Sequence, residues 1–337
     1  MTTPSTSGSR RRTPNSIGLW GAPACGKTTF LAALYIAVSR ASDELNIFGV
    51  DDLSTDFLIQ NNQMLTSKHR FPDATLAVAF YSWVMNMTAR PQVPDRGRAG
   101  RFAEEPAAIP IQFNIDMRDA PGDVFASTTE QPQESRLDLG DGDSDPGPDQ
   151  DDMMEYLAGC QGLLLLIDPL RERKNGSSHE YFQGTLLRMA QHKMGRMPPG
   201  SKLPHYVAVC ITKFDDPEVY KFARLNGFRS YDENDPYLFP RVHEDDAESF
   251  FRELCSTDES DADLICNGLR QFFHRDRIRY FVTSAIGFYR SGSRFREDDY
   301  RNAIEQDGGV TIRGQVYPIN VLEPILWLGQ SIAAGRQ

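Results

Sequence analysis

Short, unbroken apolar runs alternate along this chain with segments in which apolar residues recur every three or four positions. The unbroken runs occupy residues 17–20, 162–168, 206–211 and 280–283, and two longer strand-like stretches occupy 76–87 and 109–117. Unbroken runs of this length are typical of strands buried on both faces of a parallel sheet. The alternation of strand and helix patterns therefore predicts a three-layer α/β fold with a mostly parallel central sheet.

The helical pattern is clearest directly after the first apolar run, where Phe30, Leu31, Leu34, Tyr35 and Val38 are spaced to share one helix face. Further helices are expected near 55–65, over 153–159 and over 177–197. Near the C-terminus, Asn320 is expected to cap a last helix. The apolar residues that would line one side of this helix are Val321, Leu322, Ile325, Leu328 and Ile332.

We expect a single domain over residues 16–333, preceded by a disordered tail over 1–15 that is rich in Ser, Thr, Pro and Gly and contains the basic run Arg10–Arg12. Insertions are expected at about 41–70, 89–108, 123–152 and 216–275.

The third insertion ends in DLGDGDSDPGPDQDD (138–152), whose seven aspartates and lack of basic residues predict disorder. Asp141, Asp143 and Asp145 imitate the start of an EF-hand loop, but Pro146 stands where that loop needs glycine. Calcium binding is therefore not expected.

Composition is that of a soluble globular protein, with 40% hydrophobic and 25% charged residues in a length of 337. The net charge is 36 − 47 = −11, so most of the surface repels nucleic acid and anionic lipid, and neither is an expected partner. No stretch approaches the roughly 18–20 apolar residues of a membrane span, and no secretory signal is expected. The five cysteines are odd in number and lack CxxC spacing, which argues against a disulfide framework or zinc site and favours the cytoplasm.

Residues 21–28 read GAPACGKT and match the phosphate-loop pattern G-x-x-x-x-G-K-[ST] in full. Gly21 and Gly26 permit the backbone angles that turn successive N–H groups toward one point, and the N-terminus of the following helix adds its partial positive charge there. Lys27 is expected to reach the β- and γ-phosphates, and the Thr28 hydroxyl to ligate Mg²⁺. The alternative is a strand–turn–helix corner with an exposed lysine. The residues expected to hold the phosphates are Gly21, Ala22, Pro23, Ala24, Cys25, Gly26, Lys27, Thr28 and Thr29.

Three further short motifs follow predicted strands. In DAPG (119–122), Asp119 is expected to hold Mg²⁺ through water and the Gly122 N–H to sense the γ-phosphate, although Asp-Gly turns are common. In TKFD (212–215), the Asp215 carboxylate can accept from both the ring N–H and the exocyclic amine of guanine, a donor pair that adenine lacks.

The lysine and threonine of TKFD have expected roles too. The Lys213 stem can pack along the base, and the Thr212 side chain can tie this loop to the phosphate loop. In TSA (283–285), Ser284 and Ala285 border the same expected pocket, where the Ala285 N–H could donate to the guanine carbonyl.

The order phosphate loop, DxxG, [NT]KxD and SA resembles that of Ras-like GTPases of the translation-factor-related (TRAFAC) class over roughly residues 16–333. Thr212 stands where asparagine is commoner in that class. The resemblance implies a three-layer α/β/α P-loop NTPase fold, GTP and GDP as ligands, and Mg²⁺. Two phrases, GAPACGKTTFLAALY and NVLEPILWL, are similar to bacterial "double-GTPase" proteins encoded beside partner GTPases and effectors in conflict-type gene clusters. This similarity implies a protein effector or a companion GTPase as partner.

Several positions depart from the pattern of that class. Asp123 stands after DAPG, where many Ras-like enzymes have a glutamine that orients the attacking water, and Pro23 replaces a phosphate-loop glycine. Thr75 is expected to be the switch threonine that ligates Mg²⁺, with Thr66 as the alternative. Arg70 is a candidate arginine finger within the chain, although a solvated loop arginine is the ordinary interpretation.

We therefore expect a GTP-binding protein that hydrolyses GTP slowly with Mg²⁺ and acts as a molecular switch, accelerated by a partner protein or by self-association into a homodimer. A nucleotide-dependent scaffold that hardly cleaves GTP is the first alternative, which Asp123 favours. A phosphate-loop ATPase or small-molecule kinase is the second, which TKFD and TSA argue against.

Overall fold

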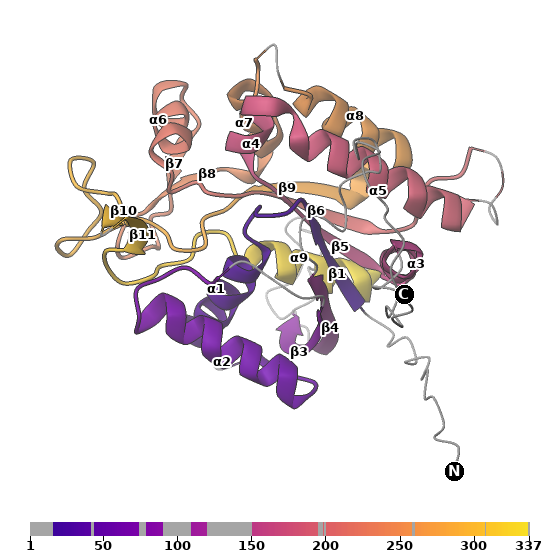
Figure 1. The fold of residues 1–337 in the computed structure, drawn as a ribbon, viewed down its shortest axis with the longest axis horizontal. Helices are drawn as coiled ribbons and strands as arrows, with labels where there is room; N and C mark the ends of the chain where they lie inside the picture. Colours follow the sequence, from indigo (N-terminus) through magenta and orange to yellow (C-terminus); the bar gives the residue numbers. More distant parts are fainter. Residues whose placement is uncertain are drawn as a thin grey trace, which may run out of the picture.

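A seven-stranded sheet forms the middle layer of the structure, a computed structural model (Figure 1). From one edge to the other its strands are β2 (Asn46–Gly49), β3 (Ala79–Ala89), β4 (Ile109–Asp119), β1 (Ser16–Gly21), β5 (Gly162–Ile167), β6 (Tyr206–Ile211) and β9 (Ile278–Val282). Strands β4, β1, β5, β6 and β9 run parallel, whereas β3 is antiparallel to β4 and β2 is antiparallel to β3. The residues described by the structure are 16–41, 44–73, 79–89, 109–119, 150–194, 198, 200–257, 260–306 and 308–335.

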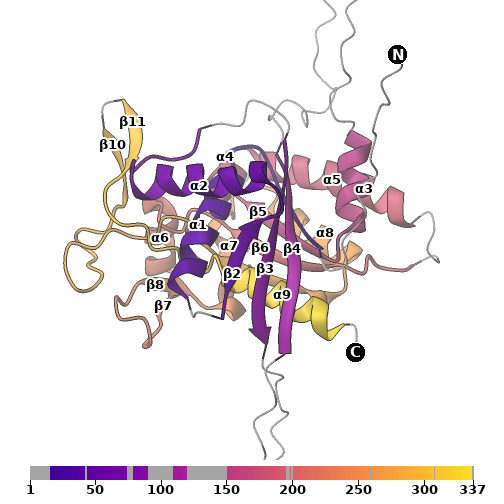
Figure 2. The same cartoon turned by 90° about the horizontal axis from the view of Figure 1, so that it is seen from below.

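Helices cover both faces of this sheet, which confirms the predicted three-layer α/β/α fold (Figures 1 and 2). One face carries α1 (Lys27–Arg40), α2 (Asp52–Thr66) and α9 (Glu323–Ala334). The other carries α3 (Gln150–Gly159), α4 (Pro169–Asn175), α5 (Ser177–Met194), α6 (Pro217–Leu225), α7 (Ala247–Leu254) and α8 (Ala262–Phe272).

Strand β5 shows why the sheet needs both helical layers. Leu163, Leu165 and Ile167 join the core on the side of α3 to α8, whereas Leu164 and Leu166 join the core on the side of α1, α2 and α9. Each of these side chains is at most 2% exposed. Burying one such side chain contributes about 1.5–3 kcal/mol, so the unbroken apolar run in the sequence is explained by packing on both faces.

Two small antiparallel sheets lie toward the same end of the molecule (Figures 1 and 2). β7 (Arg229–Tyr231) pairs with β8 (Pro240–Val242), and β10 (Ala303–Gln306) pairs with β11 (Gly309–Ile312). The short 3-10 helices η2 (Glu244–Asp246) and η3 (Arg275–Arg277) precede α7 and β9.

Asn302 fixes the base of the β10–β11 hairpin. Its Nδ2 donates to the carbonyls of Ile286 at 3.0 Å and Gln315 at 3.3 Å, and its Oδ1 accepts from the Gly314 N–H at 3.0 Å. The hairpin is thereby attached to the segment that directly follows β9.

The sequence pattern does not predict β2 or α4, and its prediction for Asn320 was wrong. Leu322 immediately precedes α9, and no side chain caps this helix. The Asn320 side chain instead donates to the Val282 carbonyl at 3.0 Å and accepts from Arg241 Nη1 at 2.9 Å. The carbonyl at the end of β9 needs a donor, and this longer-range bond takes the amide away from the helix terminus.

The predicted tail over 1–15 and most of the stretches 89–108 and 123–152 lie outside the described residues. None of the described helices is long and apolar enough to cross a membrane.

Candidate functional site

The carboxyl ends of the parallel strands form one edge, and the predicted motifs leave the sheet there. Gly21 in β1 is level with Leu166 in β5, and Ile211 in β6 is level with both Ile167 and Val282. The phosphate loop, TKFD and TSA directly follow β1, β6 and β9. Ligands of α/β folds bind at this edge because loops from several strands converge there.

The phosphate loop turns through two positive backbone angles before α1 begins. φ is 58° at Ala24 and 98° at Gly26, the residue that caps α1 without a side-chain hydrogen bond. A Cβ on Gly21 would lie 2.7 Å from both the Cys25 sulfur and the Leu166 carbonyl oxygen, so only glycine fits there. The loop therefore packs closely on β5 and leaves the first N–H groups of α1 available to an anion.

Two cations bind the carbonyls of the first half of this loop. Lys27 Nζ donates to Gly21 O at 3.1 Å and to Ala22 O at 3.2 Å. Nη1 of Arg171, from α4, donates to Pro23 O. Thr28 follows Lys27 in the first turn of α1, where its hydroxyl is the kind of hard oxygen ligand that Mg²⁺ prefers.

TKFD is joined to the phosphate loop by its threonine, as predicted. Thr212 Oγ1 lies 3.2 Å from the Cys25 carbonyl oxygen and 3.0 Å from that of Ile167. Lys213 adopts a left-handed backbone (φ 61°), and its Nζ donates to Asp168 Oδ2 at 2.6 Å. Asp168, only 1% exposed, follows β5 and is thus shared between two strand ends.

The last residue of TKFD is held by the serine of TSA. Ser284 Oγ donates to Asp215 Oδ1 at 2.5 Å and itself accepts from the Gly287 N–H at 2.8 Å. Asp215 is half-buried, and its withdrawal from bulk water raises the pKa of the carboxyl to about 6, against the lowering effect of the Ser284 bond. The carboxylate thus lacks full solvation, which a ligand with paired N–H donors would restore.

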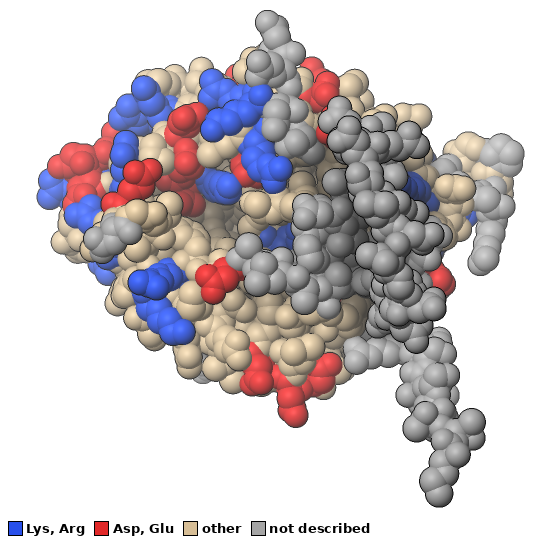
Figure 3. All heavy atoms as spheres, viewed as in Figure 1, with Lys and Arg blue, Asp and Glu red and all other residues tan. Residues whose placement is uncertain are grey.

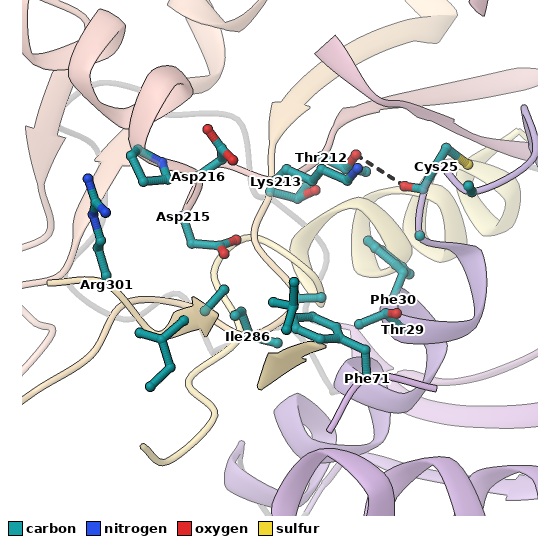
Figure 4. A pocket seen from close by; sticks show the side chains of 18 of the residues that line it. Cys25, Thr29, Phe30, Phe71, Thr212, Lys213, Asp215, Asp216, Ile286 and Arg301 are labelled. Carbon is teal, nitrogen blue, oxygen red and sulfur yellow. Dashed lines mark hydrogen bonds between the residues drawn. The ribbon is translucent and has the colours of Figure 1, made fainter. Parts of the chain in front are cut away.

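One cavity of about 700 Å³ joins the phosphate loop to TKFD and TSA. Asp215 projects into it from the loop after β6, and Cys25 lies on the opposite side of the view (Figure 4). The predicted site residues that line this cavity are Ala24, Cys25, Gly26, Thr29, Thr212, Lys213, Asp215 and Ala285. Gly21, Ala22, Pro23, Lys27 and Thr28 complete the loop beside it, and Ser284 supports Asp215.

Several lining residues carry no motif and are missed by the sequence pattern. They are Phe30, Phe71, Asp216, Pro217, Ile286, Arg301, Ala303, Ile304, Glu305 and Val310, whereas Thr283, which also lines the cavity, opens the TSA motif. The β10–β11 hairpin, which supplies some of these residues, contacts the segment before Thr75, the predicted switch threonine. The Ile312 N–H donates to His69 O at 2.8 Å, and Arg70 forms a β-bridge with Thr311. No local signal predicts this contact between distant segments. On the face shown in Figure 3, Lys and Arg side chains are interspersed with Asp and Glu around a hollow.

The predicted switch residues are placed only in part. Thr75, Gly122 and Asp123 lie outside the described residues, and Asp119 is the last residue of β4.

Thr66, the alternative switch threonine, and Arg70, the candidate arginine finger, both lie within the described residues. Thr66 ends α2, with its Oγ1 donating to Asn62 O at 2.8 Å, and Arg70 is exposed. Within the described residues, no group of three or more His, Cys, Asp or Glu side chains could hold a metal ion.

No protein-family model and no curated protein matches the chain. Among solved structures it is similar to the signal recognition particle receptor SRb-GTP/SRX complex from Chaetomium thermophilum, at 13% identity and a TM-score of 0.34, covering 83% of this chain and 94% of that one.

It is also similar to the Ski7 GTPase-like domain of S. cerevisiae. With GDP and inorganic phosphate bound, that domain gives 9% identity and a TM-score of 0.34, covering 80% of this chain and 43% of that one. With GTP bound, the same domain gives 11% identity and a TM-score of 0.33, covering 95% of this chain and 50% of that one. At these identities and scores no function follows for this chain.

Proposed function

We propose that this protein binds GTP with Mg²⁺ and hydrolyses it slowly as a nucleotide-dependent switch. One observation carries the proposal: a single cavity runs from Gly26 of the phosphate loop to Asp215 and Ala285. A phosphate-binding loop and a carboxylate that can accept two N–H bonds are thus present in one space, as a guanine nucleotide requires.

The base end of the cavity is built to hold a planar ring with adjacent donors. Asp215 would accept from the ring N–H and the exocyclic amine of guanine, and the Ala285 N–H would donate to the guanine carbonyl. Because Asp168 holds the Lys213 ammonium at 2.6 Å, the methylene stem of Lys213 is left to line the cavity beside the base. Adenine offers no matching donor pair, so the carboxylate favours guanine.

The phosphate end supplies positive charge and backbone donors. Lys27 and the first N–H groups of α1 would hold the β- and γ-phosphates. Mg²⁺ would be held by Thr28, with Asp119 and Thr75 as further proposed ligands, and would neutralise charge on the phosphate oxygens.

Slow turnover follows from the residues expected to organise water. Asp123 stands at the position where many Ras-like enzymes have a glutamine that orients the attacking water. We therefore propose that a partner accelerates cleavage. A companion GTPase or effector is the proposed partner, supported by the similarity of GAPACGKTTFLAALY and NVLEPILWL to the double-GTPase proteins. A scaffold that binds GTP without cleaving it is the second candidate, and the same Asp123 favours it.

Nucleotide preference tests the proposal most directly. GTP, ATP and xanthosine triphosphate would compete for wild-type protein and for Asp215→Asn against a fluorescent guanine nucleotide. Wild type should prefer GTP, and Asp215→Asn should lose GTP and gain xanthosine triphosphate, because an amide can donate to the ring carbonyl that replaces the guanine amine. A variant that still prefers GTP would place the base pocket elsewhere and favour the ATPase or kinase alternative.

Single-turnover cleavage across a wide range of protein concentration separates the switch from the scaffold. We expect cleavage on the order of one turnover per many minutes at the lowest concentration. Faster cleavage at higher concentration would identify self-association as the activating event. No phosphate release at any concentration would support the scaffold.

A further inference from the structure

We propose that Arg171 is an arginine finger supplied by the chain itself, a cation that contacts the γ-phosphate of GTP while its bond to the β-phosphate breaks. The inference rests on the proposed function and adds a residue that no motif in the sequence identifies. It concerns the phosphate end of the site, whereas guanine preference is decided at Asp215.

The main observation is a row of three consecutive carbonyls bound by two cations. Gly21 and Ala22 accept from Lys27, and Pro23 accepts from Arg171 Nη1. Neither cation is paired with a carboxylate in the part of the chain that the structure describes. Carbonyl dipoles compensate only part of a full charge, so two such cations at one loop favour binding of a polyanion.

The neighbouring residues fix Arg171 in this position. Asp168, buried at the end of β5, caps α4: its Oδ1 accepts from the N–H of Leu170 at 3.0 Å and of Arg171 at 3.5 Å. Its Oδ2 accepts from Lys213 at 2.6 Å. The helix turn that carries Arg171 is therefore tied to TKFD, while the Asp168 charge is already engaged by Lys213.

The guanidinium suits the charge that develops in the reaction. Water attacks the γ-phosphorus, the bond to the β-phosphate oxygen breaks, its electron pair leaves with GDP, and the water proton passes to the released phosphate and solvent. Charge spreads over the oxygens around the breaking bond. Arginine has five N–H donors in a planar fork, so the Nη1 bond to Pro23 leaves others to donate to these oxygens.

Arg171 fits this role better than Arg70, the candidate chosen from the sequence. The side chain of Arg70 is exposed, and its backbone is occupied by Met64 O at 2.9 Å and the bridge to Thr311. Its backbone contacts are thus with α2 and the hairpin, whereas the Arg171 side chain contacts the phosphate loop.

The test compares full-length wild type with Arg171→Ala and Arg171→Lys. Arg173→Ala is the matched control, because Arg173 lies on the same helix, is 40% exposed and faces Glu218 at 3.8 Å. For each protein we would measure GDP affinity by calorimetry, single-turnover GTP cleavage, and the tightening of GDP·Mg²⁺ binding by aluminium fluoride, which mimics the transferred phosphoryl group.

We expect Arg171→Ala to keep GDP affinity within about threefold, to lose the fluoride-dependent tightening, and to cleave GTP at least about 100-fold more slowly. Arg171→Lys should recover part of the rate, because it restores charge without the planar fork. Arg173→Ala should behave as wild type.

Cleavage and fluoride response that survive in Arg171→Ala would overturn the inference. A loss of GDP affinity that accounts for the whole effect would overturn it too, and would assign Arg171 to holding the loop in shape. If the wild type binds GTP without cleaving it, the fluoride-dependent tightening of GDP·Mg²⁺ binding in wild type and Arg171→Ala still tests the inference. Wild type that binds no guanine nucleotide would refute the proposed function, and this inference with it.

Discussion

Thr212 and Cys25 are 187 residues apart in sequence, yet the Thr212 hydroxyl donates to the Cys25 carbonyl across 3.2 Å. Both residues line the cavity, one from TKFD and one from the phosphate loop. The bond sets the spacing between the proposed base end and the proposed phosphate end of the site. Since the base and the phosphates of a nucleotide are a limited distance apart, this spacing determines whether one nucleotide can bind at both ends at the same time.

Replacing Thr212 by valine should weaken both the fold and nucleotide binding. The Thr212 side chain is 6% exposed, so its loss leaves a buried carbonyl without this donor, at a cost of about 1–2 kcal/mol in the free energy of unfolding. GTP affinity should fall severalfold. Urea unfolding and calorimetry measure the two effects, with Thr257→Val as control, since the Thr257 hydroxyl makes a similar bond to Arg173 O at an exposed site. Equal losses in both variants would contradict the argument.

Lys27→Ala should reduce nucleotide affinity at least about tenfold without unfolding the protein. It removes charge-assisted bonds to phosphate oxygens, each worth about 1.5–3 kcal/mol. In the described structure its Nζ bonds only to carbonyls of Gly21 and Ala22, which stay accessible to water or nucleotide. Calorimetric titration with GTP measures the loss, and Lys221→Ala on an exposed turn of α6 is the control. Unchanged GTP affinity would show that the loop does not hold the phosphates.

Gly287→Ala should destabilise the protein and weaken guanine binding together. A Cβ at this position would lie 2.0 Å from the Tyr317 carbonyl oxygen, and the backbone angle φ is +64°. The Gly287 N–H also donates to Ser284, which holds Asp215. We expect a loss of about 1–3 kcal/mol in the free energy of unfolding. Gly292→Ala is the matched control, because nothing lies within 4 Å of its Cβ position; comparable destabilisation by the two alanines would refute the steric argument.

The stability of the nucleotide-free protein should fall as pH rises from about 4 to 6, owing to Asp215. Its pKa is raised by burial from 3.8 to about 6. Below pH 4 both states hold the proton and the group has no effect. Between the two values the folded state binds more protons than the unfolded state, so the free energy of unfolding decreases with pH. Because Asp215 is only half-buried and solvent screens its charge, the decrease is on the order of 1–2 kcal/mol.

Asp215→Asn removes this titration, so the difference in stability between wild type and variant isolates it. Denaturant unfolding at a series of pH values should show that the free energy of unfolding of the variant increases relative to that of wild type from pH 4 to 7. Asp276→Asn, at an exposed site in η3, controls for general charge effects. A constant difference across this range would mean that the carboxyl is not shifted in solution.

The sequence predicts the sheet well because a strand that packs on both faces is apolar at consecutive positions, which is a local sequence pattern. Leu163 to Ile167 are apolar at every position since each faces a core, and the motifs follow the strands because loops meet at one edge. The Thr212 tie could also be anticipated from its neighbours in sequence.

What the sequence does not predict depends on long-range contacts. Arg171 and Phe71 have no spacing that distinguishes them from other surface arginines or loop aromatics, and only the fold brings them to the phosphate loop and the cavity. Asn320 has the right residue type and position for a cap, but a strand-end carbonyl competes for its amide. Strand β2 is short and lies at the sheet edge, so it lacks the continuous apolar signature of the buried strands.

The contact between the β10–β11 hairpin and residues 69–71 has a kinetic consequence. Ala303, Ile304 and Val310 form one wall of the cavity and Phe71 belongs to another. Backbone contacts at His69 and Arg70 join the two walls, so separating them is a cooperative event. Affinity depends on the free energies of the bound and empty states, whereas residence time depends on the barrier to such an opening. Under the proposed function, changes in the hairpin would therefore alter how long a nucleotide stays bound without altering the residues proposed to recognise it.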